Sequence, residues 1–190
     1  MDIYWDSIFT AINLIVTFDK KLIEVFFLSF KVTIIALLIS CLIGLPLGTF
    51  LATQKFKGRN LLIGIINSLM SLPPVVVGLF VYINLSRSGP FGWLGILYTP
   101  TAMIIAQIIL IFPIITGLTT QIIEDLQEHY NDLFVSLVTP RVTTIKAYII
   151  DARYSLITVV LAGLAKGISE VGAVIIVGGN IDHLTRVMTT

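Results

Sequence analysis

Long apolar runs alternate with short polar segments along this chain. Four of these runs are long enough to cross the ~30 Å hydrocarbon layer of a bilayer as helices. They cover residues 32–53, 61–85, 101–120 and 154–177, and the first three contain no charged residue. The pattern predicts an all-α fold, a polytopic membrane helix bundle with about four spans, in a single transmembrane domain over residues 1–190.

The first segment, residues 1–24, shows a different pattern. Polar residues recur at helical spacing along one face, and aromatic and aliphatic residues occupy the rest. This arrangement is typical of an amphipathic helix that lies along the membrane surface. The polar face consists of Asp6, Thr10, Asn13 and Thr17.

The loop between the first two runs sets the predicted orientation. It is short and carries Lys55, Lys57 and Arg59, and short basic loops stay in the cytoplasm. The N-terminus, the loop at Arg87 and the last residues are then expected outside. Residues 121–153 are expected inside.

Composition supports a membrane location. Apolar residues make up 56% of the chain, charged residues 12%, and the mean hydropathy is +0.99. A soluble domain has about 25% charged residues, so this chain must bury apolar surface in lipid. Its net charge of +1 provides no basic surface for nucleic acid. The single cysteine, Cys41, cannot form an internal disulfide.

Residues 121–153 form the most polar segment. Thr139 is a suitable helix cap and Pro140 suits the first turn of a helix, so we expect a helix, a sharp turn and a second helix. The alternative is a plain connecting loop. The length of this segment favours a docking surface on the cytoplasmic face over a plain loop. Apolar residues that would otherwise be exposed favour it too. These residues are Leu133, Phe134, Leu137 and Val138.

A double proline interrupts the second run. Pro73 and Pro74 lack backbone N–H donors, so they kink or break the helix. In lipid, the freed carbonyl groups need partners or a water-lined cavity. Two interpretations stay open: a pore-lining kink and a packing kink.

Two ionisable residues lie in the fourth run, where charge is expensive. Lys166 and Glu170 are four residues apart and share a helix face, which favours an internal ion pair over a gate element. Gly167, Ser169 and Gly172 are small and are compatible with a hydrated path. As glycines alone, Gly167 and Gly172 more often mark helix packing.

No catalytic constellation is present. His129 and His183 have no metal-ligand spacing around them, and no phosphate-binding loop or nucleophile motif occurs. An intramembrane enzyme that uses Lys166, Glu170 or His183 is therefore disfavoured. We expect no enzyme activity, no metal site and no cofactor bound by this chain.

Two motifs carry a family resemblance. SLPPVVVGLFVY at residues 71–82, and AKGISEVGAVIIVGGNI with TRVMTT within residues 165–190, resemble permeases of ATP-binding-cassette importers of type I. The similarity is strongest to tungstate-uptake permeases, followed by molybdate and sulfate permeases, and runs from about residue 28 to the end. The resemblance implies a homodimer in a prokaryotic plasma membrane that imports an oxyanion by alternating access. It also implies a cytoplasmic ABC ATPase dimer that binds ATP, and an extracytoplasmic oxyanion-binding protein.

The resemblance also implies functional regions. The translocation pathway is expected near Pro73, Pro74, Lys166, Ser169, Glu170 and Gly172. The family's ATPase-docking signature maps by spacing to the segment around residues 132–151, although its glycine and proline are replaced here. The expected docking residues are Asp132, Val138, Thr139, Pro140, Arg141 and Asp151.

The family has a further span after TRVMTT, so by this resemblance a last span appears missing. A truncated form or a fragment is expected on that basis. The alternative functions are a molybdate or sulfate permease, or a truncated permease-like subunit that does not transport.

Overall fold

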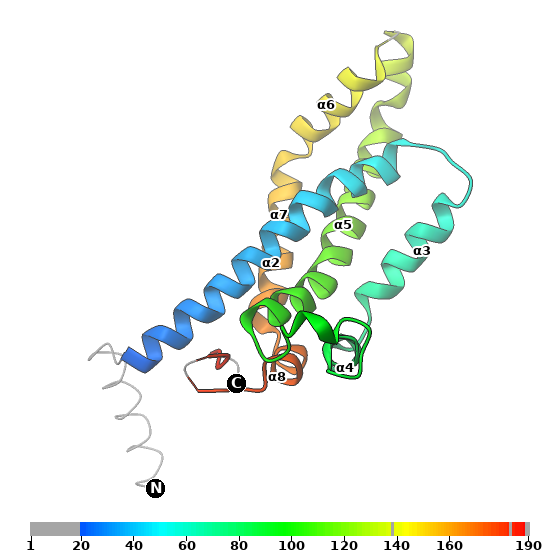
Figure 1. The fold of residues 1–190 in the computed structure, drawn as a ribbon. Helices are drawn as coiled ribbons and strands as arrows, with labels where there is room; N and C mark the ends of the chain where they lie inside the picture. The colour runs from blue at the N-terminus through cyan, green and yellow to red at the C-terminus, as the bar shows by residue number, and fades with distance from the viewer. Residues whose placement is uncertain (1–19, 138, 183, 189–190) are drawn as a thin grey trace, which may run out of the picture.

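A computed structural model describes residues 20–137, 139–182 and 184–188 (Figure 1). These residues form helices joined by turns, with no β-strand among them, which confirms the predicted all-α class. The α-helices are α2 (Lys20–Thr53), α3 (Arg59–Met70), α4 (Pro74–Leu85), α5 (Pro100–Ser136), α6 (Arg141–Asp151), α7 (Arg153–Ser169) and α8 (Gly172–Gly178), with a short 3₁₀ helix, η1, at Gly92–Leu94.

Two helices are long and apolar enough to cross a membrane alone. They are Leu22–Thr53 within α2 and Pro100–Tyr130 within α5. The pair α3 and α4 is bent by 101° at its break, and Thr143–Asp151 is bent by 65° against α7. The described chain therefore has two spans, or up to four if each bent pair counts as one, which accommodates the predicted four.

Several predicted boundaries were wrong. Residues 20–24 belong to α2 and not to a separate surface helix, because Lys20 to Lys31 contains good helix formers and no glycine or proline. The remainder of that predicted helix, residues 1–19, lies outside the described residues. The third predicted span, 101–120, continues without interruption to Ser136, because residues 121–136 also favour helix.

The long helix α5 lies at the centre of the bundle, in contact with α2, α3, α4, α7 and α8 (Figure 1). Glycines bring the neighbouring helices close to it. A Cβ atom at Gly48 of α2 would lie 2.7 Å from Thr116 O, and one at Gly163 of α7 would lie 2.7 Å from Ile115 Cδ1. Small residues at these positions let membrane helices pack backbone to backbone.

Pro113 lies inside α5 and is buried. Proline has no N–H, so the carbonyl of Ile109 loses its usual partner four residues ahead. The helix nevertheless continues through Pro113, as membrane helices often do when neighbouring helices surround them.

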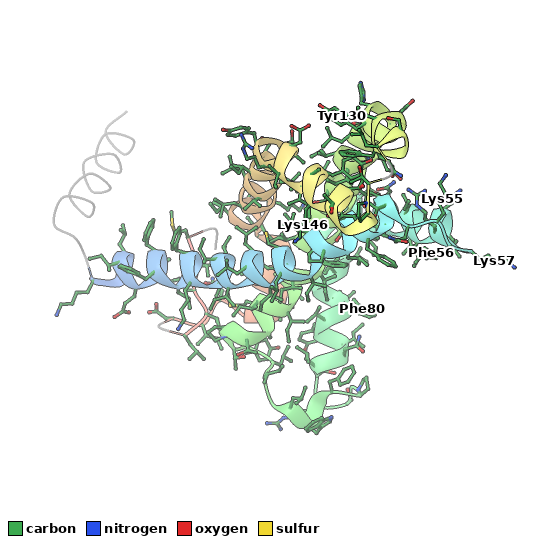
Figure 2. All side chains as sticks on the ribbon, turned by 90° about the horizontal axis from the view of Figure 1, so that it is seen from above. Lys55, Phe56, Lys57, Phe80, Tyr130 and Lys146 are labelled. Atoms are coloured by element: carbon green, nitrogen blue, oxygen red, sulfur yellow. The ribbon has the colours of Figure 1, made fainter. Side chains whose placement is uncertain are left out.

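The bundle has two ends with different contents (Figure 1). One end, which we call the docking end after the role predicted for residues 121–153, holds the turn at residues 54–58 and the turn between α5 and α6. Lys55, Phe56 and Lys57 extend from the first of these turns (Figure 2). The opposite end, the loop end, holds residues 86–99 and the segment that follows α8. The basic loop and residues 121–153 thus share one end, as the charge pattern predicted.

Candidate functional site

Two helix breaks lie side by side towards the loop end. The first break separates α3 from α4 at Leu72 and Pro73, and Pro74 starts α4. The second separates α7 from α8 at Glu170 and Val171. They are adjacent because a Cβ atom at Gly172, the first residue of α8, would lie 3.0 Å from Val75 Cγ2 and 3.7 Å from Val75 N. We call this region, residues 71–75 and 169–173, the broken-helix junction.

The second break corrects a prediction. The segment 154–177 was expected to be one helix with Lys166 and Glu170 near its middle, but Glu170 has extended backbone angles, φ −79° and ψ 121°, and ends α7. Its own side chain provides the physical reason. Glu170 Oε1 accepts a 2.9 Å hydrogen bond from the N–H of Ala173, so the carboxylate caps a new helix.

Glu170 is buried, at 4% exposure, and it is paired. Its Oε2 lies 4.0 Å from Nζ of Lys166, whose side chain is 30% exposed. The favoured ion pair is therefore present, although at the long limit of such contacts. The carboxylate holds two structural elements at once: the last turn of α7 through Lys166 and the first turn of α8 through Ala173.

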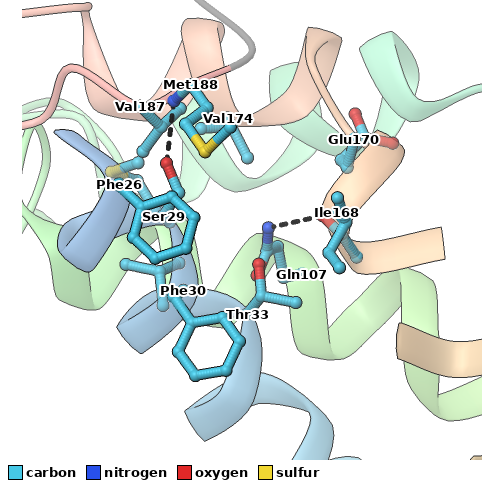
Figure 3. A pocket seen from close by; sticks show the side chains of 13 residues that line it. Phe26, Ser29, Phe30, Thr33, Gln107, Ile168, Glu170, Val174, Val187 and Met188 are labelled. Atoms are coloured by element: carbon cyan, nitrogen blue, oxygen red, sulfur yellow. Dashed lines mark hydrogen bonds between the residues drawn. The ribbon is translucent and has the colours of Figure 1, made fainter. Parts of the chain in front are cut away.

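Gln107 of α5 holds the other side of the same break. Its Nε2 donates a 3.1 Å hydrogen bond to the carbonyl of Gly167 in the last turn of α7, which also accepts a 3.4 Å hydrogen bond from the N–H of Glu170 (Figure 3). Its Oε1 is buried and has no hydrogen-bond partner among the described residues. Sequence reasoning missed this residue. The signal was available, because Gln107 is the one amide side chain in the predicted span 101–120.

A cavity of about 230 Å³ opens beside Gln107. It lies between α2, α5, the α7–α8 break and the segment after α8 (Figure 3). Ser29 closes one side, because its Oγ accepts a 2.7 Å hydrogen bond from the N–H of Met188. The lining is mostly apolar and includes Phe26, Phe30, Thr33, Ile168, Val174 and Val187.

A hydrophobic cluster fixes the junction. α4 and α8 cross closely, since a Cβ atom at Gly78 would lie 2.7 Å from the Cα of Ala173. Both helices also pack on the first three turns of α5. The cluster consists of Val77, Val81, Leu85, Ala102, Ala106, Leu110, Ala173 and Val177.

The structure thus brings most predicted pathway residues together. Pro73, Pro74, Glu170 and Gly172 all lie in the junction, and Lys166 reaches it through its ion pair. Ser169 is exposed, and its hydroxyl donates to the carbonyl of Lys166 within the same helix. Ser169 thus lies at the edge of the junction, and the pathway role of all six residues stays a prediction.

The predicted docking segment forms the expected helix pair, α5 and α6, with one correction. Thr139 does not cap α6. Its N–H donates to Phe134 O at 3.1 Å, and Pro140 takes the cap position without a side-chain hydrogen bond. Asp151 is exposed at the end of α6. Val138 lies outside the described residues, and the side chains of Asp132 and Arg141 are not described.

The junction's chemistry suits passage more than reaction. It combines interrupted backbone, one carboxylate and one ammonium group in apolar surroundings, which is typical of polar routes through membrane proteins. Among the described residues, no three His, Cys, Asp or Glu side chains come together to hold a metal ion.

Comparison with known proteins identifies the class. Residues 44–185 match the family described as "Binding-protein-dependent transport system inner membrane component", and the chain belongs to this family of membrane transport subunits. It is 41% identical to the tungstate uptake system permease protein TupB of Peptoclostridium acidaminophilum, over 95% of this chain and 79% of that protein.

Two further relatives are close. The probable anion ABC transporter permease protein of Haloferax volcanii is 34% identical, over 89% of this chain and 75% of its own length. The TupB protein of Campylobacter jejuni is 35% identical, over 72% of this chain and 57% of its own length. Sulfate and molybdenum permeases are also similar, at 26% identity or below.

Proposed function

We propose that this chain is the permease subunit of an ATP-driven importer of tungstate. The observation that carries the proposal is its 41% identity to a tungstate-uptake permease across 95% of the chain. Molybdenum and sulfate permeases match at 26% or less, so tungstate is the favoured cargo within the oxyanion group. Import of molybdate or sulfate is the alternative.

Charge supports a pathway through the junction. A dianion loses several kcal/mol or more if it is stripped of water in an apolar medium, so its route must offer polar groups or water. Lys166 supplies a partly exposed positive charge there, and the ion pair with Glu170 offsets the repulsion that a free carboxylate would exert. The breaks at Pro73 and Glu170 would let α4 and α8 move relative to α3 and α7 during alternating access.

Partners are assigned to opposite ends. Two ATPase subunits, which bind and hydrolyse the ATP, would dock from the cytoplasm at the α5–α6 helix pair. The exposed apolar side chains of Leu133, Leu137, Ile149 and Ile150 support this placement. A second permease copy would complete the pathway, and an oxyanion-binding protein would deliver the ion at the loop end.

The test is uptake in cells that lack their own tungstate and molybdate importers. The chain is co-expressed with its cognate ATPase and binding protein, and cellular tungsten is measured by mass spectrometry. We expect accumulation that requires the ATPase and that molybdate or sulfate in tenfold excess reduces only weakly. Preferential accumulation of molybdate or sulfate would show that tungstate is the wrong substrate and that the preferred oxyanion is the cargo. No accumulation of any oxyanion, with all three proteins in the membrane complex, would favour a non-transporting subunit.

A further inference from the structure

One guanidinium group joins three helices at the docking end. Arg59, the first residue of α3, donates from Nε to the carbonyl of Leu51 near the end of α2, at 2.6 Å. Its Nη2 donates to Oε1 of Glu124 on α5 and forms an ion pair with it. The two side chains are 22% and 38% exposed, so water screens this pair only in part.

The Arg59–Glu124 pair joins more distant parts of the chain than two other ion pairs of the described residues do. The pairs Lys166–Glu170 and Arg186–Asp182 join residues four apart, so each holds only a local stretch of chain. Arg59 and Glu124 are 65 residues apart and belong to different helices. Arginine suits this task because its planar group presents several donors in fixed directions, here to two acceptors at once.

The helix that Arg59 starts is otherwise lightly packed. Ile66 is the buried residue of α3, and most of the other side chains of this helix are exposed. The second half of α3 packs on α5 at Gly117, where a Cβ atom would lie 2.8 Å from Met70 Sδ, 3.2 Å from Asn67 Oδ1 and 3.6 Å from Ile66 Cγ2. Beyond Met70 the chain turns by 101° into α4, which reaches the broken-helix junction. The position of the first half of α3 therefore depends on how Arg59 is held.

Glu124 sits on the part of α5 that leads to the helix pair. Three helical turns separate it from Ser136, where α5 ends, and no break interrupts α5 between them. A displacement of the α5–α6 pair thus moves Glu124, and the ion pair passes the displacement to Arg59 and α3. α5 itself and α7, which follows α6 and ends at Glu170, provide further paths between the two regions.

From this geometry we infer that Arg59 and Glu124 are positioning residues that couple the docking end to the broken-helix junction. The pair makes α3 follow the α5–α6 helix pair, and the end of α3 then displaces the break at Pro73, which belongs to the broken-helix junction. This inference rests on the proposed function for its transport consequence, and on the structure alone for the restraint that it places on α3.

The transport test uses the complete complex of permease, ATPase and loaded binding protein in proteoliposomes. Tungstate accumulated is divided by ATP hydrolysed. We expect Arg59→Gln and Glu124→Gln each to lower this ratio about fivefold, the lower end of typical coupling between sites, with hydrolysis retained. The double variant should be no worse than Arg59→Gln alone, because Arg59→Gln already removes the ion pair. Arg59→Lys keeps the positive charge but loses the planar group with several donors, so its ratio should fall between those of Arg59→Gln and the unaltered protein.

Lys57→Gln is the matched control, because it removes a positive charge from the same turn and Lys57 is exposed. Its ratio should equal that of the unaltered protein. A pair that only stabilises the fold would lower complex yield and both rates together and leave the ratio unchanged. An unchanged ratio in both single variants, or single effects that multiply in the double variant, would overturn the inference.

A second readout does not depend on the cargo. Spin labels are placed at the exposed positions Ser68 of α3 and Glu128 of α5 in a Cys41→Ala chain, diluted with unlabelled chains in lipid nanodiscs. We expect a narrow distance distribution with Arg59 present and a clearly broader one in Arg59→Gln. Equal widths would contradict the restraint. Broadening without any oxyanion uptake by the unaltered complex would refute the proposed function and leave the restraint standing.

Discussion

Among the described residues, the loop end and the docking end of this bundle differ in the size of their buried apolar clusters. At the loop end, α4, α8 and the start of α5 share a cluster of eight buried residues. At the docking end, the corresponding cluster has four, Ala52, Ile123, Tyr148 and Ala152. Large apolar side chains are exposed at both ends, among them Leu133, Leu137, Ile149 and Ile150 on the helix pair and Phe91, Trp93 and Leu184 at the loop end.

This difference shows which geometry one chain can fix by itself. The broken-helix junction is held by contacts within the chain, through Gly78 and Ala173, Glu170 and Ala173, and Gln107 and Gly167. The docking end has a smaller cluster of this kind, and its exposed helix pair is the surface where we propose that the ATPase docks. Substitutions at the loop end should therefore alter the fold, whereas those on the exposed helix pair should alter association.

The largest effect is expected at Gly78. A valine there would place its Cβ against the backbone of Ala173, which cannot yield as a side chain can, so we expect a loss of about 3 kcal/mol or more. Thermal unfolding of the purified chain in detergent measures it. Gly64→Ala is the control, because a Cβ at exposed Gly64 meets nothing within 4 Å and should stabilise α3 slightly. Equal unfolding temperatures for the two variants would contradict the view that the contact between Gly78 and Ala173 holds the loop end.

A smaller loss is expected at Glu170. Replacement by alanine removes the carboxylate that accepts from Ala173 N–H and pairs with Lys166, which should cost about 1–3 kcal/mol. Glu170→Gln keeps an acceptor for Ala173 and should lose less stability, while uptake falls because Lys166 loses its partner. If glutamine were as destabilising as alanine, charge and not capping would hold the break.

Gln107→Leu should have a modest effect of about 1 kcal/mol. The change removes the donor to Gly167 O, but it also removes a buried amide oxygen without a partner, and the two effects oppose each other. Gln107→Glu, which puts a carboxylate where Gly167 needs a donor, should be more destabilising. Thermal unfolding of both variants, at neutral pH and at pH 5, separates them. A leucine variant as unstable as the glutamate variant would contradict this assignment.

Leu137→Ser should change stability least, by less than about 0.5 kcal/mol, because the side chain is exposed. Its effect should appear instead as weaker co-purification of the ATPase. Leu184→Ser, exposed at the loop end, is the matched control and should leave ATPase association unchanged. Full ATPase recovery with Leu137→Ser would move the docking surface elsewhere on the helix pair.

Features with a local cause could be predicted from the sequence. The break at Pro73 and Pro74 follows from missing backbone donors, and the end of α8 follows from Gly179, which has a φ of 72°. The break at Glu170 was missed, because hydropathy over 154–177 favours one continuous span and only the side-chain contact to Ala173 reveals the second helix.

Features that depend on distant contacts could not be predicted. Val75 and Gly172 are nearly a hundred residues apart, and no periodicity places them together. The same holds for Arg59 and Glu124: the sequence analysis used the charge of Arg59 only to orient the loop, and it did not single out Glu124. The prediction placed Thr139 and Pro140 each one position too far into α6. Pro140 is the N-cap, and it starts the helix by its backbone conformation and not by a side-chain hydrogen bond.

Pro113 gives α5 a further property. It lies between Leu110, which packs with the loop-end cluster, and Glu124, which binds Arg59. With one ladder bond fewer at this turn, bending α5 there takes less free energy than bending it elsewhere. The two halves of the helix can therefore tilt by unequal angles, with the bend at Pro113.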